Sequence, residues 1–164
     1  MASHGFSTEG TKIVSSFSSN VKGRTFLITG PSKGGIGAEA AISLAHGSPS
    51  IIILLGRSLA KIQPTIDSVH SLNPSIVTKF VSIKLDSLSS VRDAANTILG
   101  DPSITHIEVM INNAAIMACP YGVTMDRFEI QFATNHLSHF LLTNLLTPKI
   151  LPAGPDARII NVSS

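Results

Sequence analysis

The stretch Arg24–Gly37, RTFLITGPSKGGIG, decides the fold of this 164-residue chain. It opens with an apolar run that predicts a buried strand over Arg24–Gly30. A glycine-rich loop follows, and then a periodic segment that predicts a helix over Gly35–His46. Glycine allows a sharp turn and a close approach of backbone to a pyrophosphate, and the free N–H groups of a helix start favour phosphate. Strand, glycine turn and helix in this order therefore predict a dinucleotide-binding unit.

Two other kinds of loop have a similar composition. A glycine-rich turn that binds no ligand has the same composition, and only its place between strand and helix argues against it. A Walker-type phosphate loop needs Ser or Thr after its lysine, but Lys33 is followed by Gly34. The sequence therefore favours a dinucleotide-binding loop over both alternatives.

The remaining chain alternates apolar strands with helical segments. We expect further strands at Ser50–Leu55, Ile76–Leu85, Ile107–Ile111 and Ala157–Val162, and helices at Ser58–Leu72, Ser87–Leu99 and Thr124–Ile150. Thr124 is expected to cap the last helix, and Pro148 and Pro152 to end it. This alternation predicts an α/β fold with a doubly wound parallel sheet of the Rossmann type, incomplete on its C-terminal side. Ligands of such sheets lie beyond the carboxyl ends of the strands, where the strand order reverses.

Composition narrows the class of protein. Only 13% of residues are charged and 43% are hydrophobic, which suits a sheet covered on both faces. The net charge of +2 and the lack of a basic run argue against nucleic-acid binding. No apolar stretch approaches the roughly 20 residues of a membrane span. Residues 1–22 lack the layout of a signal peptide. We therefore expect a mobile lead-in over 1–22, with Phe6, Ile13, Val14 and Phe17 at the surface. We also expect one domain over 23–164 and a cytoplasmic location.

The end of the second strand points to the cofactor. NAD-selective sites normally place Asp or Glu there, but the sequence runs Leu55-Gly56-Arg57-Ser58. A guanidinium such as that of Arg57 can fork onto a 2′-phosphate with two hydrogen bonds. Lys33 in the glycine loop offers a second cation. The pattern favours NADP, and the alternative is a solvated surface arginine.

The histidines raise the question of a metal site. His136 and His139 are three residues apart on one helix, yet no His-Glu-x-x-His pattern is present. Cys119 is the only cysteine, so it has no partner for a cysteine-ligated metal or an internal disulfide. We therefore expect no metal site.

Several motifs together resemble the short-chain dehydrogenase/reductase family, and its retinol-dehydrogenase-like branch in particular. TGPSKGGIG over Thr29–Gly37 resembles the family's Thr-Gly-x-x-x-Gly-Ile-Gly, with one extra glycine before Ile36. The insertion leaves open whether Gly34 or Gly35 takes the middle role. The NNAA motif at 112–115 resembles the family's Asn-Asn-Ala-Gly, and NHLSHFLLTNLL at 135–146 resembles the branch's helix.

The resemblance implies roles for individual residues. Asp86 would accept a hydrogen bond from the adenine amine, although it could also cap the helix beginning at Ser87, and the two roles are compatible. Asn113 would border the cofactor ribose. Asn135 would take part in a proton relay through water, the alternative being an Asn that merely bonds a neighbouring backbone group. Ser164 would polarise the substrate carbonyl. The expected cofactor contacts are Gly30, Ser32, Lys33, Gly35, Ile36, Gly37, Arg57, Asp86 and Asn113.

The family's proton donor is a tyrosine about a dozen residues beyond Ser164, with a lysine four residues further. The only tyrosine here is Tyr121, and position 125 is Met, so the pair is absent and the chain resembles a C-terminally truncated member. The resemblance implies an oxidoreductase that transfers hydride between NADP(H) and a small-molecule alcohol or carbonyl. It also implies a homo-oligomer formed through the 124–150 helix.

Three interpretations of such a chain stay open. It is a fragment of an active enzyme, a short form that binds nucleotide without turnover, or a non-catalytic interaction protein that docks through its fifth strand and long helix.

Overall fold

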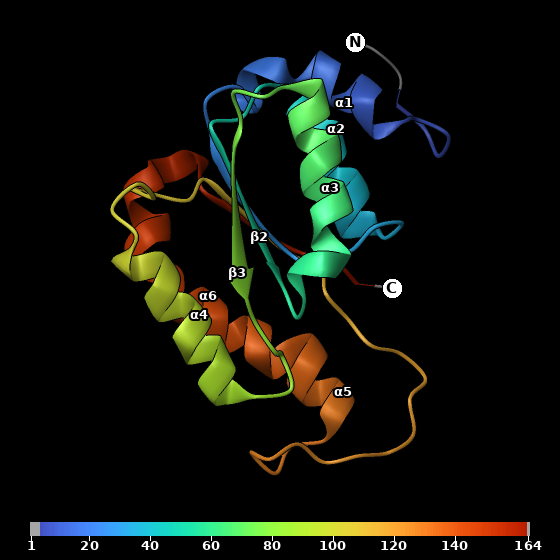
Figure 1. The fold of residues 1–164 in the computed structure, drawn as a ribbon, viewed down its shortest axis with the longest axis vertical. Helices are drawn as coiled ribbons and strands as arrows, with labels where there is room; N and C mark the ends of the chain where they lie inside the picture. Colours follow the sequence, from blue (N-terminus) through green and yellow to red (C-terminus); the bar gives the residue numbers. More distant parts are fainter. Residues whose placement is uncertain (1–3, 164) are drawn as a thin grey trace.

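The structure is a computed structural model that describes residues 4–163, and its centre is one five-stranded parallel sheet (Figure 1). The strands are β1 Thr25–Thr29, β2 Ile51–Gly56, β3 Val77–Ser82, β4 Val109–Asn112 and β5 Arg158–Asn161. They lie in the order β3-β2-β1-β4-β5. The chain therefore builds outward from β1 to β3 and then crosses back to β4, which confirms the doubly wound fold.

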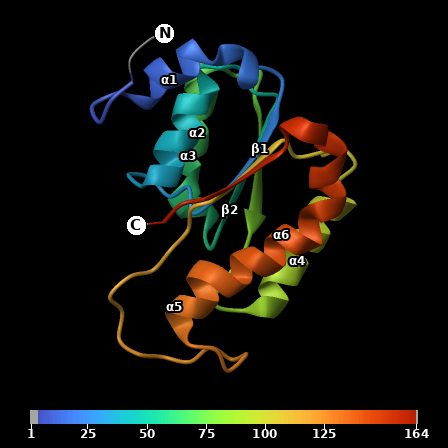
Figure 2. The same ribbon diagram turned by 180° about the vertical axis from the view of Figure 1, so that it is seen from behind.

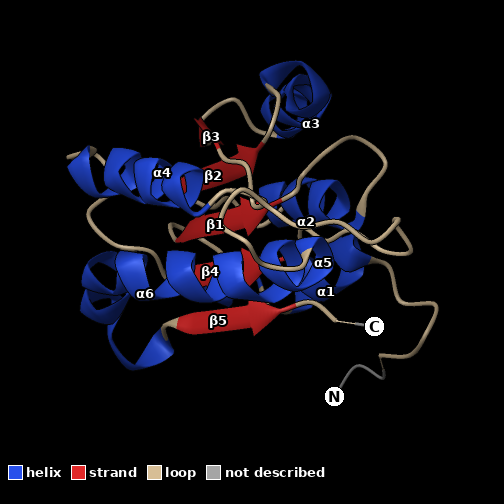
Figure 3. Ribbon diagram, turned by 90° about the horizontal axis from the view of Figure 1, so that it is seen from below, coloured by secondary structure: helices blue, strands red, loops and turns tan. Residues whose placement is uncertain are grey.

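Helices cover both faces of the sheet (Figures 2 and 3). One face carries α1 Gly10–Ser16, α2 Ile36–Ala45 and α3 Leu59–Leu72, and the other carries α4 Leu88–Gly100, α5 Ile130–Phe132 and α6 Ser138–Ile150. Among residues 4–163, no helix has both the length and the hydropathy that crossing a bilayer requires.

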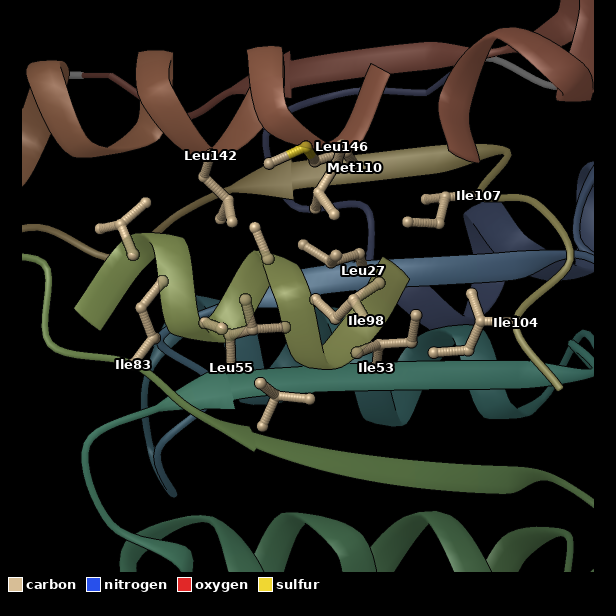
Figure 4. Packing of buried hydrophobic residues seen from close by; sticks show 14 of the residues in the cluster. Leu27, Ile53, Leu55, Ile83, Ile98, Ile104, Ile107, Met110, Leu142 and Leu146 are labelled. Carbon is tan, nitrogen blue, oxygen red and sulfur yellow. The ribbon is translucent and has the colours of Figure 1, made fainter. Parts of the chain in front are cut away.

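The two-sided cover explains why the strands are continuous apolar runs. All five residues of β1 are buried, because alternate side chains enter two different cores. Leu27 joins the core beneath α4 and α6, whereas Ile28 joins the core beneath α2 and α3. Figure 4 shows the first of these cores, where Leu27, Ile53 and Met110 meet Ile98 and Leu142. Each fully buried side chain of this kind stabilises the fold by about 1.5–3 kcal/mol. The strands, and the residues at their carboxyl ends, are therefore held in place by a well-packed core.

The segment before β1 differs from expectation. Its helix α1 packs on α2, and Val14, expected at the surface, is only 8% exposed. Val14 and Val21 share a small core with Phe26 and Val109. Val14 and Val21 can pack this closely because Gly47 has no side chain. A Cβ at Gly47 would lie only 2.6 Å from Cγ1 of Val21 and 2.9 Å from Cγ1 of Val14. The lead-in is thus part of the packed structure from Val14 onward.

The helix predicted over Thr124–Ile150 begins later than expected, at Ile130. Glu129, not Thr124, caps it: its carboxylate accepts hydrogen bonds from the backbone N–H groups of Gln131 (3.0 Å) and Phe132 (2.7 Å). The Thr124 hydroxyl instead accepts from the N–H of Phe128 and closes a turn. In that turn Arg127 has a φ of 65°, which a helix does not allow.

The same helix is also not uniform, and its end differs from expectation. It widens into a π-helical turn over Ala133–Leu137 before continuing as α6. Pro148, expected to end the helix, lies inside α6, which runs to Ile150 and is followed by a 3₁₀ segment over Leu151–Asp156. A proline near the end of a helix removes only one intrahelical donor, so the last residues can stay helical.

Candidate functional site

The glycine loop places the end of β1 directly against the turn after β4. Gly30 has a φ of 69°, and a Cβ there would lie 2.8 Å from the Cβ of Ala114. Its N–H donates to the carbonyl of Leu55 on β2, at 2.8 Å. Only glycine satisfies both the left-handed backbone and this close contact.

The two central glycines, Gly34 and Gly35, have different conformational tasks in the loop. Gly34 has a φ of 80° and open space around it, so it supplies the turn. Gly35 is the N-cap of α2 and lines the adjoining cleft, and a Cβ on it would lie 3.2 Å from the carbonyl oxygen of Ser32. A Cβ at Gly37 would lie 2.5 Å from Nδ2 of Asn113, so this glycine lets α2 pack closely.

A cleft of about 620 Å³ opens at the carboxyl ends of β1 to β4. It brings together most of the predicted cofactor residues, namely Gly30, Ser32, Gly35, Ile36, Arg57, Asp86 and Asn113. Lys33 and Gly37 are not among its lining residues: Lys33 is exposed on the loop, and Gly37 is buried behind it. The cleft lies at the reversal of strand order, where α/β sheets bind their ligands.

One basic side chain, that of Arg57, stands at the end of β2. Arg57 is exposed, lines the cleft and forms no ion pair with any residue in 4–163. No carboxylate accompanies it at this strand end, because the preceding residues are Leu55 and Gly56. The backbone N–H of Lys33 donates to the carbonyl of Lys61 at 3.3 Å, which ties the glycine loop to α3. The loop and the first turn of α3, which follows β2, are therefore held side by side.

Asp86 stands beyond β3 at the rim of the cleft. Ser87, rather than Asp86, is the N-cap of α4, and its hydroxyl accepts from the N–H of Ser90 at 3.4 Å. The Asp86 carboxylate makes no hydrogen bond to any residue within 4–163, so it is available to a donor in the cleft.

Thr29 and Asn113 join β1 to the turn after β4. The Asn113 amide donates to the carbonyls of Thr29 (2.9 Å) and Gly30 (3.3 Å). The fully buried Thr29 hydroxyl accepts from the backbone N–H groups of Asn113 (2.9 Å) and Ala114 (3.0 Å). The Asn113 amide nitrogen therefore bonds only to the backbone of Thr29 and Gly30. Asn113 also lines the cleft, next to these hydrogen bonds. Sequence reasoning missed Thr29, although a hydroxyl at the end of an apolar strand signals a buried group that needs partners.

Asn135 lies in the π-helical turn and holds the loop that follows β4. Its Oδ1 accepts from the N–H of Ile116 at 2.9 Å, and its Nδ2 donates to the Ile116 carbonyl at 2.8 Å. The side-chain amide is thus spent on backbone, as one of the two interpretations of this residue expected. Ser164 lies outside the described residues.

His139 is a site residue that sequence reasoning treated only as a metal candidate. It is 4% exposed, with Nε2 2.9 Å from the Thr29 hydroxyl and Nδ1 3.2 Å from the Asn135 carbonyl oxygen. Burial lowers the pKa of the imidazole, the carbonyl of Asn135 opposes this, and nearby His136 lowers the pKa further. The ring is therefore neutral at physiological pH.

A second cavity, of about 1000 Å³, adjoins the first and lies between β4, β5 and α6. The two cavities share Ile36 and the turn Asn113–Ala115, so an extended ligand can pass from one to the other. At its floor, the Asn112 amide donates to Oδ1 of Asn161 at 2.9 Å, while its own Oδ1 is buried without a partner.

Comparisons with known proteins agree with this architecture. The family model of the short chain dehydrogenases matches residues 24–164. Human retinol dehydrogenase 13 is 38% identical over 146 residues, which cover 88% of this chain and 42% of that protein. The short-chain dehydrogenase/reductase prx1 of Penicillium roqueforti is 39% identical over 148 residues, with the same two shares. The chain thus spans about two fifths of the length of these curated relatives.

Among solved structures, one described as a short chain dehydrogenase from Shigella flexneri complexed with NADP has a TM-score of 0.64 at 22% identity. The match covers 79% of this chain and 54% of that one. At this identity the likeness bears on the fold alone. The family model extends over residues 24–164, which include the glycine loop, the asparagine turn and all five strands described above. The chain therefore belongs to the short-chain dehydrogenase family of oxidoreductases.

Proposed function

We propose that this chain binds NADP(H) and forms the cofactor-binding part of an oxidoreductase that transfers hydride between an alcohol and a carbonyl. The observation that carries the choice of NADP(H) is the end of β2, where Arg57 lines the cleft and no carboxylate stands beside it. A carboxylate at that place would bind the ribose hydroxyl of NAD(H) and repel an added phosphate. A guanidinium does the reverse.

Each part of the dinucleotide has a partner in this arrangement. The N–H groups at the start of α2, behind Gly35, face the cleft and suit the diphosphate. Arg57, with Lys33 on the neighbouring loop, suits the 2′-phosphate, and Asp86 suits the amino group of adenine. The passage between the two cavities, past Ile36, leads towards the nicotinamide end.

Two buried polar atoms support a ligand in these cavities. Thr134 lines the first cavity, and its hydroxyl is buried without a partner. Asn112 lines the second, and its Oδ1 is equally unpartnered. Buried polar groups nearly always have hydrogen-bond partners in folded proteins. Atoms this buried lie just behind the cavity walls, so a polar ligand or its bound water would reach them once the side chain turns towards the cavity.

When bound, the nicotinamide supplies the hydride of the reaction. Ser164 would polarise the substrate carbonyl, as the resemblance implies, whereas the Asn135 side-chain amide is already bonded to the backbone of Ile116. This sequence contains no tyrosine followed four residues later by lysine, so we assign the turnover to a protein that includes such a pair. The name of the human relative suggests a bulky apolar alcohol as the substrate class.

Nucleotide titration of the purified chain tests the proposal. We expect NADPH to raise the melting temperature, and to do so at lower concentration than NADH, because a ligand that binds only the folded state stabilises it once its concentration exceeds its dissociation constant. A folded protein with no shift at millimolar NADPH would refute nucleotide binding. It would favour instead an interaction protein derived from a dehydrogenase, for which the exposed strand β5 offers an edge.

A further inference from the structure

The hydrogen bonds around Thr29 determine where the proton of His139 lies. The Thr29 hydroxyl accepts two backbone N–H groups, those of Asn113 and Ala114, and these occupy both of its lone pairs. Its single proton must therefore point to the remaining neighbour, Nε2 of His139 at 2.9 Å. Nε2 is the acceptor, so a neutral ring carries its proton on Nδ1. From there it donates to the carbonyl of Asn135 at 3.2 Å.

This ring joins three parts of the candidate site that are far apart in the sequence. Thr29 ends β1, the Asn113–Ala114 turn follows β4, and Asn135 lies in the π-helical turn. All three are connected through one buried side chain on α6. The turn after β4 lines both cavities, so a displacement of the ring would move the wall along which a dinucleotide lies.

We propose that His139 is a positioning residue whose ring must be neutral, with its one N–H at Nδ1, to hold the turn after β4 in the conformation that binds cofactor. The proposal rests on the proposed function, because it concerns the same cavities. A protonated ring would present an Nε2–H to a hydroxyl whose lone pairs are already used. Two donors would then face each other in a buried site, which is unfavourable.

The pH dependence expected of His139 depends on which other titratable groups lie near its ring. The groups that reach the ring from β1 and β4 are Thr29 and the turn 112–114, and none of them titrates. Among residues 4–163, His136 on the same helix is the titratable group that acts on it. Because the folded-state pKa of His139 lies below its ordinary value of about 6.5, the unfolded chain takes up a proton first as the pH falls. Stability therefore decreases below about pH 6.5 and levels off below the folded-state pKa.

The tautomer can be measured without any ligand. Imidazole ¹⁵N chemical shifts of the folded chain at pH 7.5 should show a protonated Nδ1 and an unprotonated Nε2 for His139. The reverse tautomer, or a protonated ring at this pH, would overturn the proposal directly.

The positioning role is tested by NADP⁺ affinity between pH 7.5 and 5.5. We expect His139→Phe, which keeps a ring but removes both hydrogen bonds, to weaken binding about 3- to 10-fold at pH 7.5. His139→Gln keeps an acceptor for Thr29 and should recover most of the affinity. It should lack the additional loss that the wild type shows at low pH. His136→Phe is the matched control: it keeps His139, so it should keep the loss of affinity at low pH, displaced towards higher pH because the neighbouring charge that lowers the pKa of His139 is gone.

The comparison between variants matters because a 2′-phosphate itself titrates near pH 6, and that contribution is common to all of them. If His139→Phe does not fold, the pH profile of His139→Gln decides by itself. A His139→Gln profile equal to that of the wild type would overturn the positioning role and leave the proposed function standing. If the wild type binds no NADP⁺, the proposed function fails, and the role of His139 in it fails as well.

Discussion

The glycine loop over Thr29–Gly37 and the segment over Ala115–Leu137 build the same cavities by opposite means. In the loop, the conformation depends on side chains that are absent: Gly30 and Gly37 leave no room for a Cβ. In the later segment, the conformation depends on side chains that are present. Asn135 holds Ile116, and the Asp126 carboxylate accepts from the N–H of Leu88 at 2.8 Å. The first region should therefore break when atoms are added, and the second when atoms are removed.

The largest effect is expected in the loop, for Gly30→Ala. The added Cβ meets Ala114 at 2.8 Å while the backbone keeps a φ of 69°, so we expect a loss of about 2–5 kcal/mol in unfolding free energy. Gly34→Ala is the matched control, since Gly34 has a φ of 80° but nothing within 4 Å; it should cost about 1–2 kcal/mol. Urea unfolding of both variants measures the difference, and equal costs would show that conformation alone, not contact, requires Gly30.

Arg57→Asp changes charge beside the loop rather than its shape. Removal of a charge-assisted hydrogen bond and addition of a negative charge should weaken NADPH binding about 10- to 100-fold. NADH binding should hold or improve, because Asp can accept from the ribose hydroxyl. Arg92→Asp, on exposed α4, alters the net charge equally and should leave both affinities unchanged. An unaltered ratio of NADPH to NADH affinity in Arg57→Asp would refute the assigned specificity.

Asn135→Ala tests the second region by removal of atoms. Two hydrogen bonds to Ile116 disappear, but water can replace them at this exposed place, so the expected cost is about 1–2 kcal/mol. The backbone amide of Ile116 should exchange with deuterium much faster. Asn144→Ala removes a single exposed bond to the Phe140 carbonyl on the same helix, and should change neither quantity appreciably. Protection of Ile116 that survives in Asn135→Ala would mean that other contacts hold the loop.

The smallest effect is expected for Thr134→Val, which keeps the shape of the side chain and removes the unpartnered hydroxyl. The free chain should become more stable by up to about 1 kcal/mol, because a buried unsatisfied group is removed. NADPH affinity should fall about 2- to 5-fold if the ligand or its water satisfies that hydroxyl. Isothermal titration with NADPH and thermal unfolding separate the two effects. Lower stability with unchanged affinity would show that the hydroxyl serves the free fold instead.

Much of the fold was predictable because its determinants are local. The apolar runs that become β1 and β2 are buried on both faces, and their composition alone shows this. The same holds for the loop, where only glycine tolerates the required backbone at Gly30. The start of the 124–150 helix was not predictable, because Thr124 and Glu129 are both acceptable caps by sequence. The turn at Arg127 and the contact of Asp126 with α4 favour Glu129.

The sequence by itself determined the alternation of strands and helices, the glycine loop and the absence of an acid after β2, since each depends on residues adjacent in the chain. Only the tertiary structure decided how the functional side chains are used. Asn135 is committed to Ile116, Asp86 is relieved of capping by Ser87, and His139 carries its proton on Nδ1 because Thr29 has no lone pair left. The physical reason is that a hydrogen-bonding group has a fixed number of donors and lone pairs. Which of them remain for chemistry depends on partners that folding brings from distant parts of the chain.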